Sequence, residues 1–382
     1  MERDNSVYDA IIIGSGIVGL ALSRALGERG KKILVLERND FAVGASIRNF
    51  GMIWPIGQPD GELYERAMLS KSIWHQICKE ANIWYDPVGS LHLAYNKQEM
   101  DVLSDFHEAT KDTRDYRLLD ASQTRKLSSS IVSKNLEGGL FSADEIILDS
   151  PKAIRSLPSY LTEKYGVEFR WNRFVRHVET GKVFCGKEIY EADEIYVSTG
   201  PDFETIFPEI FAELPITKCK LQMMRFAQQP YQWKLGPALC GGLSLIHYKS
   251  FQAAGASLEQ LKNYYEQEFS EYLKWGIHVM ACQNQSGELV IGDSHEYGKT
   301  HDPFDKQFIN RLILDYLSGF ARFPKEEISA SWNGTYAKMM DGSTFFLHEP
   351  MDGVTILNGL GGLGMTFSFG LTEQLINGNL NT

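Results

Sequence analysis

Cysteine is scarce in this 382-residue sequence, and its spacing excludes two common kinds of site. The five cysteines are scattered, and no two of them form a Cys-x-x-Cys pair. Many structural zinc sites and dithiol redox sites are built from such pairs. The sequence therefore predicts no metal site. Five scattered cysteines, an odd number, suggest no disulfide framework, so we expect reduced thiols. Reduced thiols are typical of cytoplasmic proteins, in which disulfides are rare.

Long apolar runs and an excess of positive charge are absent as well. No stretch approaches the roughly 18 apolar residues that a membrane-spanning helix needs. Residues 1–6 lack the basic and apolar pattern that opens a secretory signal. The formal net charge is −11, whereas phosphate binding needs a basic face. We therefore expect no export signal, no membrane span and no nucleic-acid partner.

The N-terminal part of the chain carries the pattern of a βαβ unit. Residues 7–13 form an apolar run of strand length, residues 17–29 are rich in Ala and Leu with helical spacing, and residues 32–37 form a second apolar run. A strand, helix and strand in this order predict a parallel sheet with a right-handed crossover. Apolar runs at 193–200 and 353–360 predict two more buried strands.

The rest of the chain has a different pattern of apolar and polar residues, which predicts another type of sheet. Apolar and polar residues alternate near 88–95, 216–227, 242–249 and 288–293, which predicts a mixed or antiparallel sheet. Helical spacing recurs near 62–82, 98–111, 151–165, 258–274 and 304–320. We predict an α/β fold in which a Rossmann-like dinucleotide-binding domain (1–87, 145–215 and 325–382) carries an inserted, sheet-rich α+β domain (88–144 and 216–324).

Gly14-Ser15-Gly16-Ile17-Val18-Gly19 is a GxGxxG motif between the first strand and the first helix. In this context the first glycine permits a tight turn, the second lets the backbone approach a pyrophosphate, and the third allows close helix–strand packing. The helix N-terminus offers free N–H groups to the phosphates. Glu37 ends the second strand, where an acidic side chain takes the ribose hydroxyls.

A second glycine cluster favours FAD over NAD as the dinucleotide. The loop Gly44–Met52 follows the second strand, and it contains small residues and the hydroxyl of Ser46. The segment Gly359–Thr366 follows the last predicted strand and opens a helix. A helix N-terminus there would stabilise the negative charge that a flavin gains on reduction. An NAD-linked dehydrogenase, the rival interpretation, has no use for this second cluster.

Further short motifs, each different, are distributed along nearly the whole chain. They are the Ser46, Asn49 and Gly51 loop, Val197-Ser198-Thr199-Gly200 after Ala192-Asp193, Leu289-Val290-Ile291-Gly292-Asp293, Trp332-Asn333-Gly334 and the Gly359–Gly364 cluster. With the fingerprint, they resemble the D-amino-acid-oxidase-like FAD oxidoreductases, which include glycine oxidase and sarcosine oxidase. Arg48-Asn49-Phe50-Gly51-Met52-Ile53-Trp54-Pro55, Cys219-Lys220-Leu221-Gln222-Met223-Met224-Arg225 and Gly292-Asp293-Ser294-His295 resemble a clade linked to aminophosphonate breakdown.

The resemblance implies an FAD domain, a substrate domain, and hydride transfer from the carbon beside an amine to flavin N5. The resulting imine hydrolyses to a carbonyl compound, and the flavin performs the redox chemistry. The fingerprint and the resemblance together predict these FAD-binding residues: Gly14, Gly16, Ile17, Val18, Gly19, Glu37, Arg38, Ser46, Asn49, Gly51, Met52, Val175, Thr199, Gly200, Gly361, Gly362, Leu363, Gly364, Met365 and Thr366.

The sequence departs from these relatives at three positions. Some relatives tether FAD to a His near the position of Arg48, and others to a Cys near the position of Gly334, so we expect non-covalent FAD. The sarcosine-oxidase branch has an oxygen-activating Lys where this chain has Val290. We therefore expect a slow reaction with O2, and we leave O2 or another electron acceptor open.

A group of basic side chains predicts the kind of substrate. Arg48, His247, Lys249 and His295 are expected to form a cationic rim, with Arg48, His247 and His295 as the candidate catalytic residues. Arg can bind a carboxylate or phosphonate bidentately. We expect a small primary or N-methylated amine with an anionic group, an aminophosphonate or an amino acid. The alternatives are a D-amino acid or glycine-type enzyme, and a flavoprotein for electron transfer or binding that oxidises no substrate itself.

Overall fold

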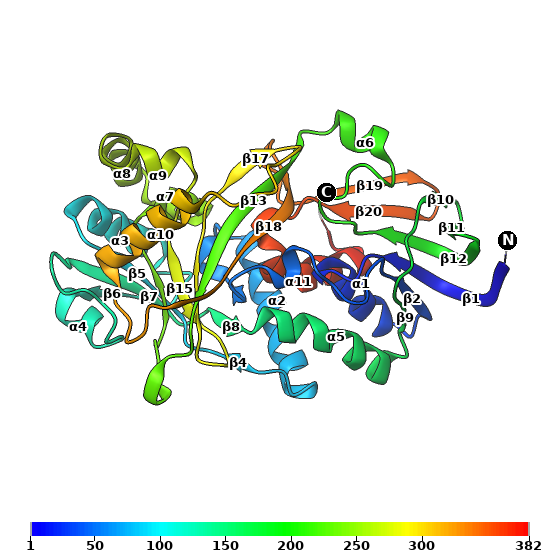
Figure 1. Cartoon of the computed structure of the whole chain (residues 1–382), viewed down its shortest axis with the longest axis horizontal. Helices are drawn as coiled ribbons and strands as arrows, with labels where there is room; N and C mark the ends of the chain where they lie inside the picture. Colours follow the sequence, from blue (N-terminus) through cyan, green and yellow to red (C-terminus); the bar gives the residue numbers. More distant parts are fainter. Residues whose placement is uncertain (1, 381–382) are drawn as a thin grey trace.

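The computed structural model describes residues 2–380, which form two lobes, each built around a β-sheet (Figure 1). A three-stranded sheet of β3 (Met52–Ile53), β8 (Ile146–Leu148) and β4 (Tyr85–Asp86) adds to them. Among the described residues, no helix combines the length and the apolar character needed to cross a membrane.

The first lobe contains an eight-stranded sheet within the described residues. Its strands are β1 (Glu2–Ile13), β2 (Ile33–Leu36), β9 (Glu168–Arg170), β10 (His177–Glu179), β11 (Lys182–Cys185), β12 (Glu188–Val197), β19 (Phe346–Met351) and β20 (Val354–Asn358). The hydrogen-bonded order is β10-β11-β12-β1-β2-β9, and β20 pairs with both β12 and β19. Strands β12, β1, β2 and β9 run parallel, as does β20 with β12, so the predicted α/β class and parallel sheet are confirmed.

Four helices cover one face of this sheet. They are α1 (Ile17–Gly27), α2 (Glu62–Glu80), α5 (Ser150–Tyr165) and α11 (Gly364–Ile376). Because side chains alternate along a strand, Ala10 and Ile12 of β1 pack with these helices, whereas Ile11 and Ile13 belong to the core on the other face. A side chain on Gly370 of α11 would lie 2.4 Å from the carbonyl oxygen of Arg66, so glycine permits the close crossing of α11 and α2.

The second lobe contains a mostly antiparallel sheet with nine strands in the described part of the chain. Its strands are β5 (Ser90–Ala94), β6 (Tyr116–Asp120), β7 (Gly138–Ser142), β13 (Ile216–Phe226), β14 (Ala238–Cys240), β15 (Met280–Gln283), β16 (Leu289–Gly292), β17 (Glu296–Gly298) and β18 (Ile328–Met339). The order is β17-β13-β16-β15-β14-β5-β7-β6, with β18 beside β13. Only β14 and β5 pair in parallel among these strands, which agrees with the predicted mixed sheet.

Helices cover both faces of the second sheet. Helices α3 (Lys97–Thr110), α7 (Leu243–His247) and α8 (Ala256–Glu268) pack on the face that also contacts the first lobe, and α10 (Gln307–Phe320) packs on the other face. The remaining helices are α4 (Ala121–Arg125), α6 (Pro208–Glu213) and α9 (Ser270–Lys274). The strand β18 lies beyond the predicted domain boundary at residue 325, yet it pairs with β13 along its length.

Two predicted elements differ in the structure. The alternation at 242–249 predicted a strand, but the segment forms α7 followed by a 3-10 helix, Lys249–Ala254. The prediction is wrong because the segment packs over the sheet: Leu243 and Leu245 are both buried there as part of the helical layer. The helix predicted at 258–274 is interrupted at Phe269, whose φ of −128° and ψ of 26° separate α8 from α9.

Candidate active site

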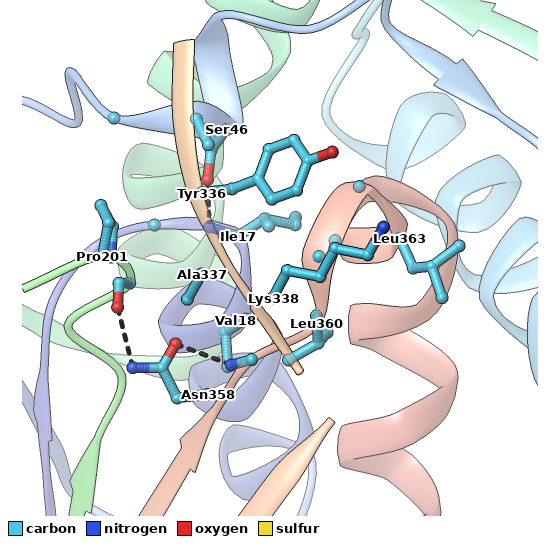
Figure 2. Close-up of a pocket in the computed structure, with 18 of the residues that line it drawn as sticks. Ile17, Val18, Ser46, Pro201, Tyr336, Ala337, Lys338, Asn358, Leu360 and Leu363 are labelled. Carbon is cyan, nitrogen blue, oxygen red and sulfur yellow. Dashed lines mark hydrogen bonds between the residues drawn. The ribbon is translucent and has the colours of Figure 1, made fainter. Parts of the chain in front are cut away.

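A cavity of about 680 Å³ runs between the two lobes. One end is lined by the first turn of α1 and by the ends of β2 and β12, and the other end by β13, β15, β18 and the loop after α7. The C-terminal turn Gly361–Leu363 lines the same cavity, where Gly361 and Gly362 lie beside Lys338 and Tyr336 (Figure 2). The volume falls within the range of sites that hold a cofactor or a small ligand.

The three glycines of the fingerprint have three different surroundings. Gly14 has a φ of +102°, and a side chain there would lie 2.6 Å from the carbonyl oxygen of Ser198. A side chain on Gly19 would lie 2.0 Å from the carbonyl oxygen of Gly14, which explains the close packing of helix and strand. Gly16 differs, because the atom nearest to its added side chain is the Ser46 hydroxyl at 3.4 Å, and its open side faces the cavity. This arrangement fits a pyrophosphate against Gly16.

The loop after β2 is held by side chains that were predicted to contact the cofactor. The backbone N–H of Ile17 donates to the Ser46 hydroxyl at 2.9 Å (Figure 2). The Asn49 amide donates to the carbonyl oxygens of Ala45 and Ser46, both at 2.9 Å, and its oxygen accepts from the Gly51 N–H at 2.8 Å. Ser46 and Asn49 therefore line the cavity and also fix the shape of its wall.

Glu37 is buried at the end of β2 and reaches the cavity wall. One carboxylate oxygen accepts from the backbone N–H and the hydroxyl of Ser15, both at 3.0 Å, and the other accepts from the Asn39 N–H at 3.0 Å. A carboxylate oxygen has more than one acceptor position. The placement fits the predicted contact with ribose hydroxyls. Arg38 pairs with Asp202 at 2.8 Å nearby.

The C-terminal glycine cluster closes the middle of the cavity wall. A 3-10 turn at Gly361–Leu363 leads into α11, whose N-terminus begins at Gly364. The Asn358 amide donates to the carbonyl oxygen of Gly200 at 2.8 Å, which ties the end of β20 to the loop after β12 (Figure 2). A side chain added at Gly361 or Gly362 would make only ordinary van der Waals contacts, with Lys338 and Tyr336 respectively, and the cavity-facing glycines and the helix N-terminus fit a flat, anionic ring system.

Most of the predicted cofactor residues line this cavity. Those that do are Gly14, Gly16, Ile17, Val18, Glu37, Arg38, Ser46, Asn49, Val175, Thr199, Gly200, Gly361, Gly362, Leu363, Gly364 and Met365. The cavity wall does not include the remaining four, Gly19, Gly51, Met52 and Thr366.

Packing explains why Gly51, Met52 and Thr366 lie behind the wall. Gly51 has a φ of +81°, and a side chain there would lie 2.0 Å from the carbonyl oxygen of Leu148. Met52 is buried in the core of the second lobe. The Thr366 hydroxyl accepts from the Trp54 N–H at 3.0 Å. These residues therefore support the cavity wall, and their direct contact with FAD stays a prediction.

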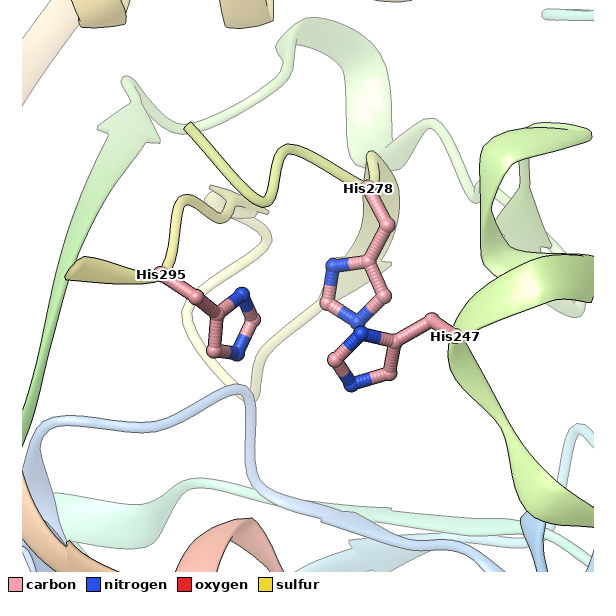
Figure 3. A group of neighbouring side chains, drawn as sticks. All are labelled: His247, His278 and His295. Atoms are coloured by element: carbon pink, nitrogen blue, oxygen red, sulfur yellow. The ribbon is translucent and has the colours of Figure 1, made fainter. Parts of the chain in front are cut away.

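A histidine cluster forms part of the other end of the cavity (Figure 3). His247 is open to the cavity, and the buried His278 and His295 lie beside it. The ring centroids of His247 and His278 are 3.8 Å apart, and those of His247 and His295 are 4.8 Å apart. Sequence reasoning found His247 and His295, but it missed His278 and Asp293, whose Oδ1 lies 2.7 Å from Nδ1 of His278.

The charge of this end differs from the predicted cationic rim. Burial lowers the pKa of His295. The His247 ring is open to the cavity but is surrounded by protein, and this desolvation, together with the neighbouring histidines and Lys338, lowers its pKa well below the usual value. Both imidazoles are therefore neutral near pH 7, so the expectation that they carry positive charge is corrected. Lys249 is exposed, and its ammonium donates to the carbonyl oxygen of Gly342 at 2.8 Å.

Besides Lys249, which also lines the cavity, two strongly basic side chains lie at this end. Arg48 lines the cavity, and its Nη1 donates to the carbonyl oxygen of Asn333 at 3.1 Å. Lys338 also lines the cavity, and its ammonium lies 3.0 Å from the Tyr297 hydroxyl. Sequence reasoning missed Lys338. The available signal was its spacing from Gly334 and Tyr336, because every second residue of a strand shares one face.

Comparisons with known proteins agree with this geometry. Residues 9–376 match the family described as FAD dependent oxidoreductase. The chain belongs to this family. A "D-amino acid dehydrogenase" of Helicobacter pylori is 26% identical over 252 residues, which cover 50% of this chain and 60% of that protein. One polypeptide of the opine oxidase of Agrobacterium tumefaciens is 21% identical over 362 residues, covering 89% of this chain and 85% of that polypeptide.

Solved structures share the fold of this oxidoreductase. The glycine oxidase of Geobacillus kaustophilus aligns with a TM-score of 0.77 at 16% identity, and the alignment covers 98% of this chain and 96% of that one. The match to the H. pylori dehydrogenase spans only about 60% of its length. The family establishes FAD as the cofactor, and the cavity residues described above are those that would hold it.

Proposed function

We propose that this oxidoreductase oxidises a small primary or N-methylated amine that carries an anionic group at its far end. The observation that carries the proposal is the pair of cations, Arg48 and Lys338, that line the cavity beyond the glycine-rich wall. When bound, FAD supplies the acceptor for the hydride of the carbon beside the amine. The imine product hydrolyses to a carbonyl compound.

The acidic side chains of the cavity are placed in keeping with such a substrate. Among the described residues, the cavity wall contains three carboxylates: Glu37, Asp202 and Asp293. Glu37 and Asp202 belong to the end that fits the ribose, and Asp293 lies against His278. An amine must be neutral to release a hydride from its carbon, and a ring of carboxylates would hold it as an ammonium. The substrate is therefore held by its anionic end.

A phosphonate is our first choice for the anionic group, ahead of the carboxylate of a simple amino acid. The support is the narrower resemblance of the segments around Arg48, Cys219 and Asp293 to proteins linked to aminophosphonate breakdown. An arginine and a lysine suit the two negative charges of a phosphonate. The alternative, a D-amino acid or glycine-type substrate, is supported by the names of the relatives.

Three further properties belong to this proposal. FAD is bound without a covalent link, because Arg48 and Gly334 stand near the positions at which relatives carry a tethering His or Cys, and neither residue can form such a link. The electron acceptor is O2 or another oxidant, and the reaction with O2 is slow because Val290 supplies no positive charge where the resemblance places the oxygen-activating Lys of the sarcosine-oxidase branch. The five free cysteines are in keeping with a cytoplasmic location.

Anaerobic bleaching of the flavin tests the proposed function. The purified protein is mixed without oxygen with 2-aminoethylphosphonate, N-methyl-2-aminoethylphosphonate, glycine, N-methylglycine, several D-amino acids and propylamine. We expect the flavin absorbance to fall fastest with the two phosphonates and not at all with propylamine. Equal bleaching by propylamine would contradict the anionic end. Bleaching by none of these compounds would favour a flavoprotein that oxidises no amine itself.

A further inference from the structure

The histidine cluster has a feature that amine oxidation does not require. His247, His278 and His295 each offer one ring nitrogen, and these three nitrogens lie within 4.8 Å of one another (Figure 3). The residues come from α7, from the segment before β15 and from the loop after β16, so the fold brings together side chains that are distant in sequence.

We propose that His247, His278 and His295 form a binding site for a divalent transition-metal ion of the Zn2+ type. Three histidines with a fourth position left open are an established ligand set for such ions. Nitrogen ligands favour zinc and its neighbours over Mg2+ and Ca2+, which prefer oxygen.

His295 already has the supporting hydrogen bond that a metal-binding histidine needs, and His278 lies within ion-pair distance of a carboxylate without a hydrogen bond of good geometry to it. Nδ1 of His278 lies 2.7 Å from Oδ1 of Asp293, and Nδ1 of His295 is hydrogen-bonded to the carbonyl oxygen of Gly276 at 2.9 Å. A carboxylate or a backbone carbonyl on one ring nitrogen fixes the orientation of the ring and leaves Nε2 for the metal. His278 and His295 are also buried, so their rings are held in place by packing.

The third ligand has the freedom to complete the site. Tetrahedral zinc with Zn–N distances of about 2.1 Å places its ligand nitrogens about 3.4 Å apart, so the cluster must contract slightly. His247 is the last residue of α7 and is open to the cavity, so rotation of its side chain can bring its ring closer. The open coordination position then faces the cavity.

The charges around the cluster have opposite effects on a bound cation. Asp293 favours it, since Oδ2 of Asp293 lies 3.8 Å from Nε2 of His295 and Oδ1 touches His278. The positive charge of Lys338 lies near enough to lower the pKa of His247 and His295, and the same charge repels a cation bound between them. A bound ion would also present positive charge to the cavity, where it could take an oxygen of an anionic substrate. This last consequence rests on the proposed function, whereas the metal site does not.

Calorimetric titration with Zn2+ tests the site directly. The FAD-loaded protein is treated with EDTA, desalted and titrated with Zn2+ and, separately, with Mg2+, in the absence of any amine. We expect one Zn2+ per chain and no measurable binding of Mg2+. His247→Gln should lower the Zn2+ affinity on the order of 100-fold or more, because loss of a mere supporting contact already costs about 10- to 100-fold.

His348→Gln is the matched control, because His348 is an exposed histidine of β19 outside the cluster. Its Zn2+ affinity should equal that of the unaltered protein. Flavin absorbance and the melting temperature show that each variant is folded and loaded. The proposal is overturned if the unaltered protein binds no Zn2+, if His247→Gln binds it undiminished, or if Mg2+ binds equally well. None of these outcomes depends on whether an amine bleaches the flavin.

Discussion

Arg48 and Gly334 lie directly against each other. A side chain on Gly334 would lie 3.3 Å from both Cβ and the carbonyl oxygen of Arg48. Two hydrogen bonds join the same segments, from Arg48 Nη1 to the Asn333 carbonyl oxygen at 3.1 Å and from Trp332 Nε1 to the Arg48 carbonyl oxygen at 3.3 Å. The resemblance to the family places the tethers of some relatives near these two residues, and here both residues line the cavity.

This contact leads to the first prediction, that all of the FAD is released when the protein is denatured. Neither a guanidinium nor a glycine can form the histidyl or cysteinyl link that relatives use. Precipitation with acid should leave the yellow colour in the supernatant, where its absorbance is measured against that of the native protein. Flavin remaining in the washed pellet would show that another residue forms a covalent link.

Arg48→Met should lower kcat/KM for the best substrate by about 30- to 1000-fold. Loss of a bidentate contact to a charged group costs on the order of 2–4 kcal/mol, and about 1.36 kcal/mol corresponds to a factor of ten. The measurement is steady-state turnover, with the flavin spectrum as evidence that FAD stays bound.

Arg225→Met is the control for this variant. Arg225 stacks on Trp332 with its guanidinium 5.4 Å from the ring centroid, and it pairs with Glu288 at 3.4 Å, but it does not line the cavity. We expect kcat/KM within a few-fold of the unaltered enzyme. If the two variants lose activity equally, Arg48 acts on the stability of the wall and is not the anchor of the substrate.

Lys338 should make the binding of anions depend on pH. Burial lowers the pKa of Lys338 below its usual value. Its ammonium therefore attracts anions at low pH, and this attraction is lost as the pH rises through the lowered pKa, earlier than for an exposed lysine. Ethanesulfonate is a suitable probe because its own charge stays constant over this range. Its Kd, measured from the flavin spectrum, should rise with pH, and the rise should begin at a lower pH than for an exposed lysine.

Two substitutions separate this effect from a general loss of binding. Lys338→Arg keeps the charge, because arginine stays protonated, so its Kd should stay flat as the pH increases. Lys338→Met should bind ethanesulfonate weakly at every pH. A Kd for the unaltered protein that does not change with pH would remove Lys338 from the anion site.

Gly16→Val should abolish loading with FAD. The open side of Gly16 faces the cavity where the pyrophosphate is expected, and a branched side chain would fill that space. The ratio of flavin to protein absorbance after purification measures the effect. Gly319→Val is the control, because nothing lies within 4 Å of an added side chain at this exposed position of α10. A Gly16→Val protein that purifies fully loaded would contradict the assigned role.

The cofactor half of the site was largely predictable, because local sequence determines it. The GxGxxG turn, Glu37 at the end of β2 and the glycine turn before α11 each depend on a few consecutive residues and on the phosphate chemistry they serve. The exceptions are residues such as Gly51 and Thr366, whose neighbours Leu148 and Trp54 are distant in sequence. Family-like motifs do not distinguish a residue that touches a ligand from one that supports the wall.

The substrate half depends on tertiary packing, and the sequence therefore predicted it poorly. The Gly242–Tyr248 segment alternates like a strand, but its position over the sheet makes it a helix that directs His247 into the cavity. His278 and Asp293 meet because their backbones are hydrogen-bonded across the ends of β15 and β16. His247 and His295 are neutral because the surrounding protein lowers the pKa of both side chains, and the number of charged residues in a sequence does not reveal such a shift.

The parts of the FAD site lie far apart along the chain, which affects how the protein is made. Gly14 and Gly364 are 350 positions apart, yet both line the same cavity. At a synthesis rate of about 5–20 residues per second, roughly 20 to 70 s pass between the appearance of the first glycine turn and that of α11. During this interval α1 and α2 lack the helix that buries their apolar faces. The nascent chain therefore emerges with exposed hydrophobic surface and no complete dinucleotide cradle. Cofactor capture therefore belongs to the final stage of synthesis, when α11 packs against α1 and α2.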